Sequence, residues 1–200
     1  SCMKHYLGYS AARNGKDRTP AYIPEIELRE YYLPQFAAAV KAGSSTIMIN
    51  SGEINGEPVH ASKYLLTTVL RKELGFQGMI VTDWEDIIRL HTRHNVAATP
   101  RQAIAMAINA GIDMSMVPGD FSFYDLLLEA VKKGEVPMSR IDDAVKRILL
   151  LKYKVGLFDN PYPEAAAKNN FGKPSYQTLA LDAAHESMTL LKNQNNVLPL

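Results

Sequence analysis

Short apolar segments alternate with longer amphipathic ones along the first part of the chain, and this alternation restricts the fold more than any other feature. Strand patterns cover residues 2–8, 46–49, 79–82 and 112–117, with helical patterns at 24–42, 63–74 and 100–111 between them. A strand that recurs after each helix is typical of βαβ units, which build a parallel sheet or barrel. Four units are half of an eight-stranded barrel. We therefore expect an α/β fold, the C-terminal half of a TIM-like (β/α)8 barrel, in a piece of a longer protein.

Two local signals refine the helix predictions. Pro34 lies inside the first helical pattern, and it should bend that helix or split it in two. Helices are also predicted at 124–133 and 139–155, the second with Ser139 as the cap of a capping box. The predicted buried face of that last helix consists of Ile141, Val145, Ile148 and Leu149.

The composition changes near residue 156 and predicts a domain boundary. Residues 157–175 are rich in Pro, Ala and Asn, without apolar periodicity, and are interpreted as a linker. A helical pattern follows at about 176–192. We therefore predict a barrel part at 1–156, and the start of a second domain at 176–200.

Composition and charge exclude several classes of function. A hydrophobic share of 46% suffices for a sizeable core. With 22 Lys and Arg against 21 Asp and Glu, and with no basic cluster, binding to nucleic acid through bulk charge is unsupported. The one cysteine, Cys2, excludes an internal disulfide but leaves the compartment open. The sequence has no apolar run long enough to span a membrane.

The segment from Gly75 to Asp86 holds the main candidate for chemistry. Asp83 follows the short apolar strand at 79–82, and the carboxyl ends of parallel strands face the binding crevice. Asp83 could instead cap the following helix, as Asp often does. The neighbouring Trp84 favours the first interpretation, because its flat apolar face suits a sugar ring.

Other polar residues near the predicted strand ends allow more than one interpretation. Lys4 and His5 could hydrogen-bond ligand hydroxyls, Lys4 could form a Schiff base, or both could be structural. Glu85 and Asp86 could supply a second acid, but adjacent side chains diverge, which favours solvated or capping roles for both.

The segment with His91 and His94 has a spacing that could place two imidazoles on one helix face, as in metal sites. No acidic or Cys partner stands at ligand spacing. We expect a surface loop here, and no metal.

Several motifs in order along nearly the whole chain resemble glycoside hydrolase family 3, in particular its two-domain β-glucosidases and exo-β-glucanases. They are Lys4-His5-Tyr6, the stretch from Gly75 to Trp84, Ala110 to Met114, Met138 to Val145 with Gly156-Leu157-Phe158, and Glu186 to Asn193 with Leu198-Pro199-Leu200. The resemblance implies that residues from 176 enter an α/β-sandwich domain.

By this resemblance the protein is a retaining exo-acting β-glucosidase that needs no cofactor and acts on β-linked gluco-oligosaccharides. Asp83 would be the nucleophile, Trp84 would pack on the sugar, Lys4 and His5 would bind its hydroxyls, and Met48 would line the same subsite. A β-xylosidase, a non-catalytic carbohydrate-binding relative and a Schiff-base lyase are the alternatives. The resemblance favours a periplasmic or secreted protein, and oligomeric state stays open.

Two departures from the family pattern concern the site. Ser51 stands where some relatives have Tyr, so the shape of the site on the leaving-group side is expected to differ from theirs. The loop after the first strand offers Asp17-Arg18-Thr19, with an Asp but without the His that forms an acid/base pair in single-domain hexosaminidases of the family. We expect the acid/base beyond Leu200, and no activity from these 200 residues alone.

Overall fold

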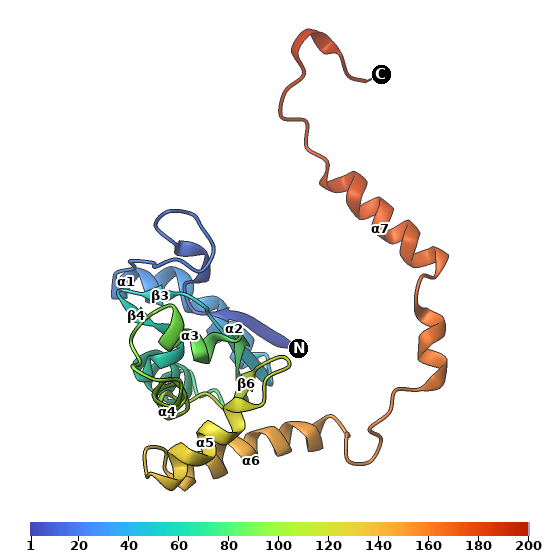
Figure 1. The fold of residues 1–200 in the computed structure, drawn as a ribbon. Coiled ribbons are helices and arrows are strands. Elements are labelled where there is room, and N and C mark those ends of the chain that lie inside the picture. Colours follow the sequence, from blue (N-terminus) through green and yellow to red (C-terminus); the bar gives the residue numbers. More distant parts are fainter. Residues whose placement is uncertain (200) are drawn as a thin grey trace. The chain divides into compact units, whose positions relative to one another are not determined.

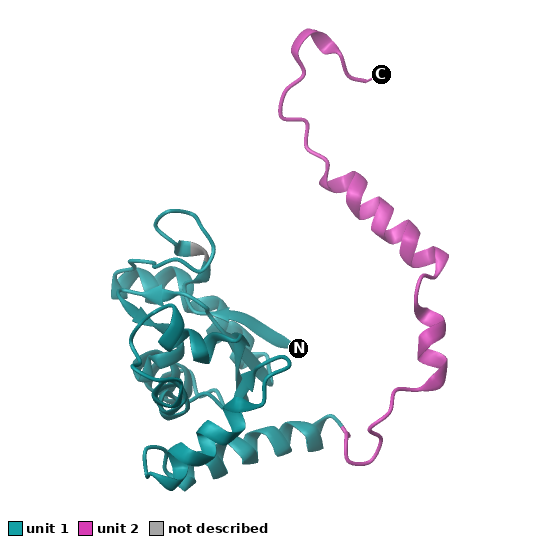
Figure 2. Ribbon diagram, viewed as in Figure 1, with its two compact units in different colours: residues 1–155 teal, residues 156–200 magenta. Residues whose placement is uncertain are grey.

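The computed structural model describes residues 1–199 and, for Ser10, the backbone alone. It divides into two compact units, residues 1–155 and 156–200 (Figure 2). The segment predicted to start a second domain ends at Leu200, which lies outside the described residues.

The first unit is built on a four-stranded sheet in the order β1-β2-β5-β6 (Figure 1). Its strands are β1 (Cys2–Tyr6), β2 (Thr46–Ile49), β5 (Met79–Trp84) and β6 (Met114–Met116). All three pairings are parallel, with Ile47 opposite Ile80 at the centre. The predicted α/β fold with a parallel sheet is confirmed. β5 runs further than predicted, so that Asp83 lies inside the strand.

The helix predicted at 24–42 is broken, as Pro34 requires. α1 (Glu25–Glu27) continues as a π-helical turn over Leu28–Tyr32, and α2 (Pro34–Lys41) begins at the proline. A first helical position suits proline, because the N–H that it lacks has no helical acceptor there. The next predicted helix forms over Tyr64–Glu73 with π-helical hydrogen bonding.

Two segments that the sequence left as irregular contain regular structure. Residues 50–62 hold a small hairpin of β3 (Glu53–Ile54) and β4 (Glu57–Pro58), followed by a 3-10 turn over Val59–Ala61. α3 (Asp86–Thr92) follows β5 directly. No start signal for α3 is present in the sequence, because its N-cap is Glu85 in a left-handed conformation, without a capping side-chain bond.

α4 (Pro100–Ala110) has its predicted boundaries. The Thr99 hydroxyl accepts the Gln102 N–H at 3.2 Å, so Thr99 caps the helix as expected. Gly111 ends it with φ of 126°, and a Cβ there would lie 3.2 Å from Thr67 Oγ1. Both the backbone angle and the close approach require glycine.

α5 (Ser122–Lys132) and α6 (Met138–Lys154) complete the first unit. Two predictions for α6 are wrong. Ser139 does not cap it, since the helix begins one residue earlier after Pro137 and no side chain makes a capping bond. Of the predicted buried face, Val145 and Leu149 are each 46% exposed.

An ion-pair cluster around Asp113 explains the orientation of α6. Arg140 and Arg147, separated by two helical turns, point to Asp113, the residue just before β6. Arg71 adds a third guanidinium, with its Nη2 2.6 Å from Asp113 Oδ2. The Asp113 side chain has no exposed surface, and the N–H of Ile80 also donates to it at 2.9 Å. These arginines define the inner face of the helix together with Ala144, which is buried, and Ile141, which packs against the core.

The second unit contains a 3-10 segment (Ala165–Asn170), α7 (Pro174–Ser187) and a short turn at Gln194–Asn196. α7 ends earlier than the predicted helix at 176–192. Its apolar residues are exposed, including Leu179, so no packing within the unit stabilises a longer helix. Within residues 1–199, no helix is long and apolar enough to cross a bilayer.

Candidate active site

The predicted site residues come from three neighbouring strands, near their carboxyl ends. Lys4 and His5 lie in β1, Met48 lies in β2, and Asp83 is the next-to-last residue of β5. His5 Nε2 is 3.7 Å from Asp83 Oδ2, so the structure brings these two side chains together. Asp83 does not cap α3, the alternative that the sequence left open, because Glu85 occupies that position.

Hydrogen bonds and positive charge keep Asp83 ionised. Its Oδ1 accepts the N–H of Trp84 at 2.6 Å, and its Oδ2 accepts the hydroxyl of Ser51 at 3.0 Å. Burial opposes the charged form, but these donors together with Arg18 and His5 outweigh it and hold the pKa of Asp83 below its ordinary value. The side chain keeps 15% of its surface exposed, so the carboxylate is both charged and reachable.

Arg18 joins the site, which the sequence did not predict. Its Nη2 lies 3.5 Å from Asp83 Oδ2, and its Nη1 lies 3.7 Å from Asp86 Oδ1. Asp17, the residue that the sequence singled out in this loop, has a side chain that is 63% exposed and accepts a hydrogen bond from Tyr9. The sequence signal that could have identified Arg18 was its position, because its loop follows the carboxyl end of β1, where the site lies.

Asp86 is buried, which corrects the predicted solvated or capping role. Its side chain is 2% exposed, and its Oδ2 forms a hydrogen bond with the Ser51 hydroxyl. Burial raises the pKa of Asp86 to about 6, against the opposing effects of Ser51 and Arg18. The left-handed backbone of Glu85, at φ of 60°, turns the chain so that Asp86 comes back toward Asp83. Glu85 itself is exposed as predicted, with 44% of its side-chain surface free.

The other predicted site residues lie toward solvent. Trp84 is 49% exposed at the end of β5, and Lys4 is exposed on β1. Met48 is half-buried in β2. His5 stacks on Tyr9, with ring centroids 4.6 Å apart. Burial lowers the pKa of His5, only partly offset by Asp83, so this ring is mainly neutral at pH 7.

The segment at His91–His94 is not a simple surface loop. His91 belongs to α3 and its Nδ1 lies 2.9 Å from the Ala97 carbonyl oxygen. The His94 side chain is 5% exposed and pairs with Glu53 of the small hairpin. Residues 1–199 contain no group of three His, Cys, Asp or Glu side chains arranged to hold a metal ion.

His60, from the 3-10 turn after β4, is a buried neighbour that the sequence missed. Its Nε2 lies 3.8 Å from Asp86 Oδ2 and has no hydrogen-bond partner within the described part of the chain. Burial lowers the pKa of His60 to about 3, so the ring is neutral at physiological pH.

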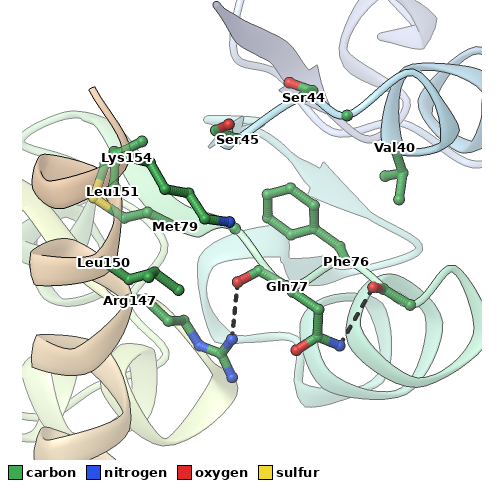
Figure 3. Close-up of a pocket in the computed structure, with 13 residues that line it drawn as sticks. Val40, Ser44, Ser45, Phe76, Gln77, Met79, Arg147, Leu150, Leu151 and Lys154 are labelled. Carbon is green, nitrogen blue, oxygen red and sulfur yellow. Dashed lines mark hydrogen bonds between the residues drawn. The ribbon is translucent and has the colours of Figure 1, made fainter. Parts of the chain in front are cut away.

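A separate pocket of about 300 Å³ lies at the opposite ends of the strands (Figure 3). Ser44 and Ser45 precede β2, and Gln77 precedes β5, while Arg147 and Lys154 come from α6. Arg147 donates to the Gln77 carbonyl at 3.1 Å. Because the candidate catalytic groups lie at the carboxyl ends, this pocket is not the active site.

Asp86 should make stability depend on pH. Its raised pKa means that the native state binds more protons than the unfolded state between about pH 4 and pH 6, so stability falls as pH rises through that window. Relative to Asp86→Asn, which does not titrate, the wild-type protein should lose about 2–3 kcal/mol of unfolding free energy between pH 4 and pH 7. Urea unfolding of both proteins at the two pH values measures this. An equal difference at both would show that folding does not raise the pKa of Asp86.

Known proteins with similar sequences align with nearly the whole chain. A lysosomal β-glucosidase of Dictyostelium discoideum is 55% identical over 98% of the chain and 24% of its own length. A β-xylosidase of Formosa agariphila is 40% identical over 98% of the chain and 28% of its own length. The chain thus spans about a quarter of the length of these curated relatives.

Solved structures and a family model agree with these relatives. A β-glucosidase from Listeria innocua in complex with glucose superposes with a TM-score of 0.89 at 31% identity, covering 100% of the chain and 27% of its own. The model of the glycosyl hydrolase family 3 N terminal domain matches residues 1–151. From this match, which spans the whole parallel sheet and the residues around Asp83, the chain belongs to glycosyl hydrolase family 3.

Proposed function

We propose that the protein is a retaining, exo-acting β-glucosidase that removes terminal, non-reducing β-D-glucosyl residues from oligosaccharides. The observation that carries the proposal is the Asp83 carboxylate, held ionised at the end of β5 by donors from Ser51 and Trp84 and by the charge of Arg18. The family relatives with this activity support the same reaction.

In the proposed reaction an oxygen of Asp83 attacks the anomeric carbon while the bond to the leaving oxygen breaks. A second carboxyl protonates that oxygen, and a covalent glycosyl-enzyme forms. The second carboxyl then takes a proton from water, the water oxygen attacks the anomeric carbon, and the bond to Asp83 breaks. Two inversions give net retention at the anomeric carbon.

We assign substrate binding to four side chains around Asp83. Lys4 and His5 hydrogen-bond sugar hydroxyls, contacts that strengthen as the ring distorts toward its oxocarbenium-like transition state. Trp84 packs its exposed ring on the apolar face of the sugar. Met48 lines the same subsite from β2.

We place the acid/base outside these 200 residues. A retaining mechanism needs a second carboxyl about 5–5.5 Å from the nucleophile and in reach of the leaving oxygen. Asp86 lies close to Asp83, but its side chain is 2% exposed and is hydrogen-bonded to Ser51, so it is not accessible to a leaving group. These residues alone should therefore not turn over substrate.

The same proposal includes the architecture and location of the protein. Residues 1–156 would be the C-terminal part of a (β/α)8 barrel, 157–175 a linker and 176–200 the entry into an α/β-sandwich domain. The protein would work without a cofactor, in the periplasm or outside the cell.

A β-xylosidase is the second candidate, because one of the relatives carries that name at 40% identity. Glucose and xylose differ only in the C6 hydroxymethyl group, and the residues assigned above contact features that both sugars share. The ratio of kcat/KM for 4-nitrophenyl β-glucoside and β-xyloside separates the two specificities.

Covalent labelling tests the proposal. The complete protein, treated with a 2-deoxy-2-fluoro-β-glucoside carrying a good leaving group, should accumulate the glycosyl-enzyme, because fluorine slows its hydrolysis. Mass spectrometry of the digest should find the label on the peptide with Asp83. Hydrolysis of β-glucosides together with a label on another carboxylate would contradict the assignment, and sugar binding with neither label nor hydrolysis would favour a non-catalytic relative.

A further inference from the structure

We propose that Asp86 is a positioning residue that works in its protonated form: its carboxyl O–H donates to Ser51, and Ser51 then donates its single hydrogen to Asp83. The inference rests on the proposed role of Asp83 as nucleophile. It assigns a function to a buried carboxyl that the reaction itself does not use.

Ser51 has too few hydrogens to donate to two ionised carboxylates. The Ser51 hydroxyl lies within hydrogen-bond distance of both Asp83 Oδ2, at 3.0 Å, and Asp86 Oδ2. A hydroxyl has one hydrogen to donate, whereas an ionised carboxylate can only accept. With both carboxyls ionised, one of the two contacts would place two lone pairs against each other. A proton on Asp86 removes the conflict and fixes the direction of both bonds.

Ser51, Asp83 and Asp86 differ in their exposure to solvent. Ser51 and Asp86 are 1% and 2% exposed, whereas Asp83 keeps contact with solvent at 15%. A shared proton therefore resides on the more deeply buried carboxyl, because burial disfavours the charged form. The raised pKa of Asp86 and the lowered pKa of Asp83 agree with this distribution.

Charged and titratable groups face Asp86 from each element packed against it. They are Arg18 from the loop after β1, His94 and Arg89 from α3 and its C-terminal end, His60 from the 3-10 turn, and Asp83 from β5. Arg18 also pairs with Asp83, and Arg89 also pairs with Glu85, so Asp86 shares both cations with other carboxylates. Neutral His60 adds no charge.

Ionisation of Asp86 should weaken the interactions that keep Asp83 in position. Ser51 and Arg18 are then shared with a second negative charge, and the single Ser51 hydrogen turns to the buried carboxylate. Asp83 loses a donor that orients it toward the anomeric carbon. Loss of one such hydrogen bond corresponds to about a tenfold lower rate of glycosylation.

The test is the rate of labelling of the complete protein by 2,4-dinitrophenyl 2-deoxy-2-fluoro-β-D-glucoside between pH 4.5 and pH 8. Its leaving group needs no protonation, so the acid/base does not shape this profile. The wild-type rate should fall about tenfold as pH rises from 5 to 7.5, with a midpoint near the Asp86 pKa of about 6.

Three variants isolate the cause of that fall. Asp86→Asn keeps a neutral donor to Ser51, so its rate should stay within about threefold of wild type at pH 5 and should not fall up to pH 7.5. Ser51→Ala should label about tenfold more slowly at pH 5, again without the fall. Asp125→Asn, an isosteric change of an exposed acid on α5, should keep the wild-type profile.

The outcomes separate this inference from the proposed function. A fall that persists in Asp86→Asn, or in Ser51→Ala if the first variant does not fold, would assign the titration to another group such as His5 and overturn the role of Asp86. A flat wild-type profile would overturn it as well. In either case, a label on Asp83 would leave the nucleophile assignment intact, and only a label elsewhere would refute both.

Discussion

Replacing Asp83 by alanine in the complete protein is expected to lower kcat for β-glucoside hydrolysis by about 10⁴-fold or more. Without the carboxylate no glycosyl-enzyme can form, and binding contacts and the acid/base supply only the residual rate. Loss of the carboxylate also frees the donors from Ser51 and Trp84, but the Asp83 side chain is 15% exposed, so water can enter the space that it vacates. The variant should therefore stay folded, which circular dichroism and thermal melting check.

Azide makes this result diagnostic of a nucleophile. The space vacated in Asp83→Ala lets azide attack the anomeric carbon from the same side, so an activated β-glucoside should give α-glucosyl azide and part of the lost rate should return. Asp125→Ala, an exposed acid on α5, is the matched control and should keep wild-type kcat. More than a tenth of wild-type activity in Asp83→Ala, or a β-configured azide product, would contradict the assignment.

Replacing Asp113 by alanine should have the largest effect on stability. Three guanidinium groups converge on this buried carboxylate, from Arg71, Arg140 and Arg147. Burial already lowers the pKa of Arg71 to about 10, although Asp113 offsets part of that cost. Removal of the anion leaves partly buried positive charges facing one another, which typically costs about 3–5 kcal/mol.

Thermal unfolding measures this cost. For a unit of this size the midpoint should fall by about 6–20 °C, since each kcal/mol corresponds to about 2–4 °C. Asp142→Ala, which removes an exposed acid from α6, the helix that carries Arg140 and Arg147, should change the midpoint by less than about 2 °C. Equal midpoints for the two variants would show that Asp113 contributes no more than a surface charge.

The outline of the fold and one half of the site could be predicted from the sequence. The periodicity of apolar residues depends on local geometry, so strands and helices could be located, and with them the end of β5 that presents Asp83. Local chemistry also fixed the break at Pro34 and both ends of α4, where Thr99 and Gly111 act through their immediate neighbours. Each of these features is encoded within a few residues of where it acts.

The other half of the site depended on contacts between distant segments. Asp86, Ser51 and Arg18 converge only because the left-handed turn at Glu85 and two loops after separate strands bring them together. The same holds for α6, whose inner face is defined by Arg140 and Arg147 because their partner, Asp113, comes from another element. Sequence alone determined the parallel α/β framework and the position of Asp83. The tertiary structure decided which polar groups are buried around it, because burial and charge pairing depend on the whole packed unit and not on local periodicity.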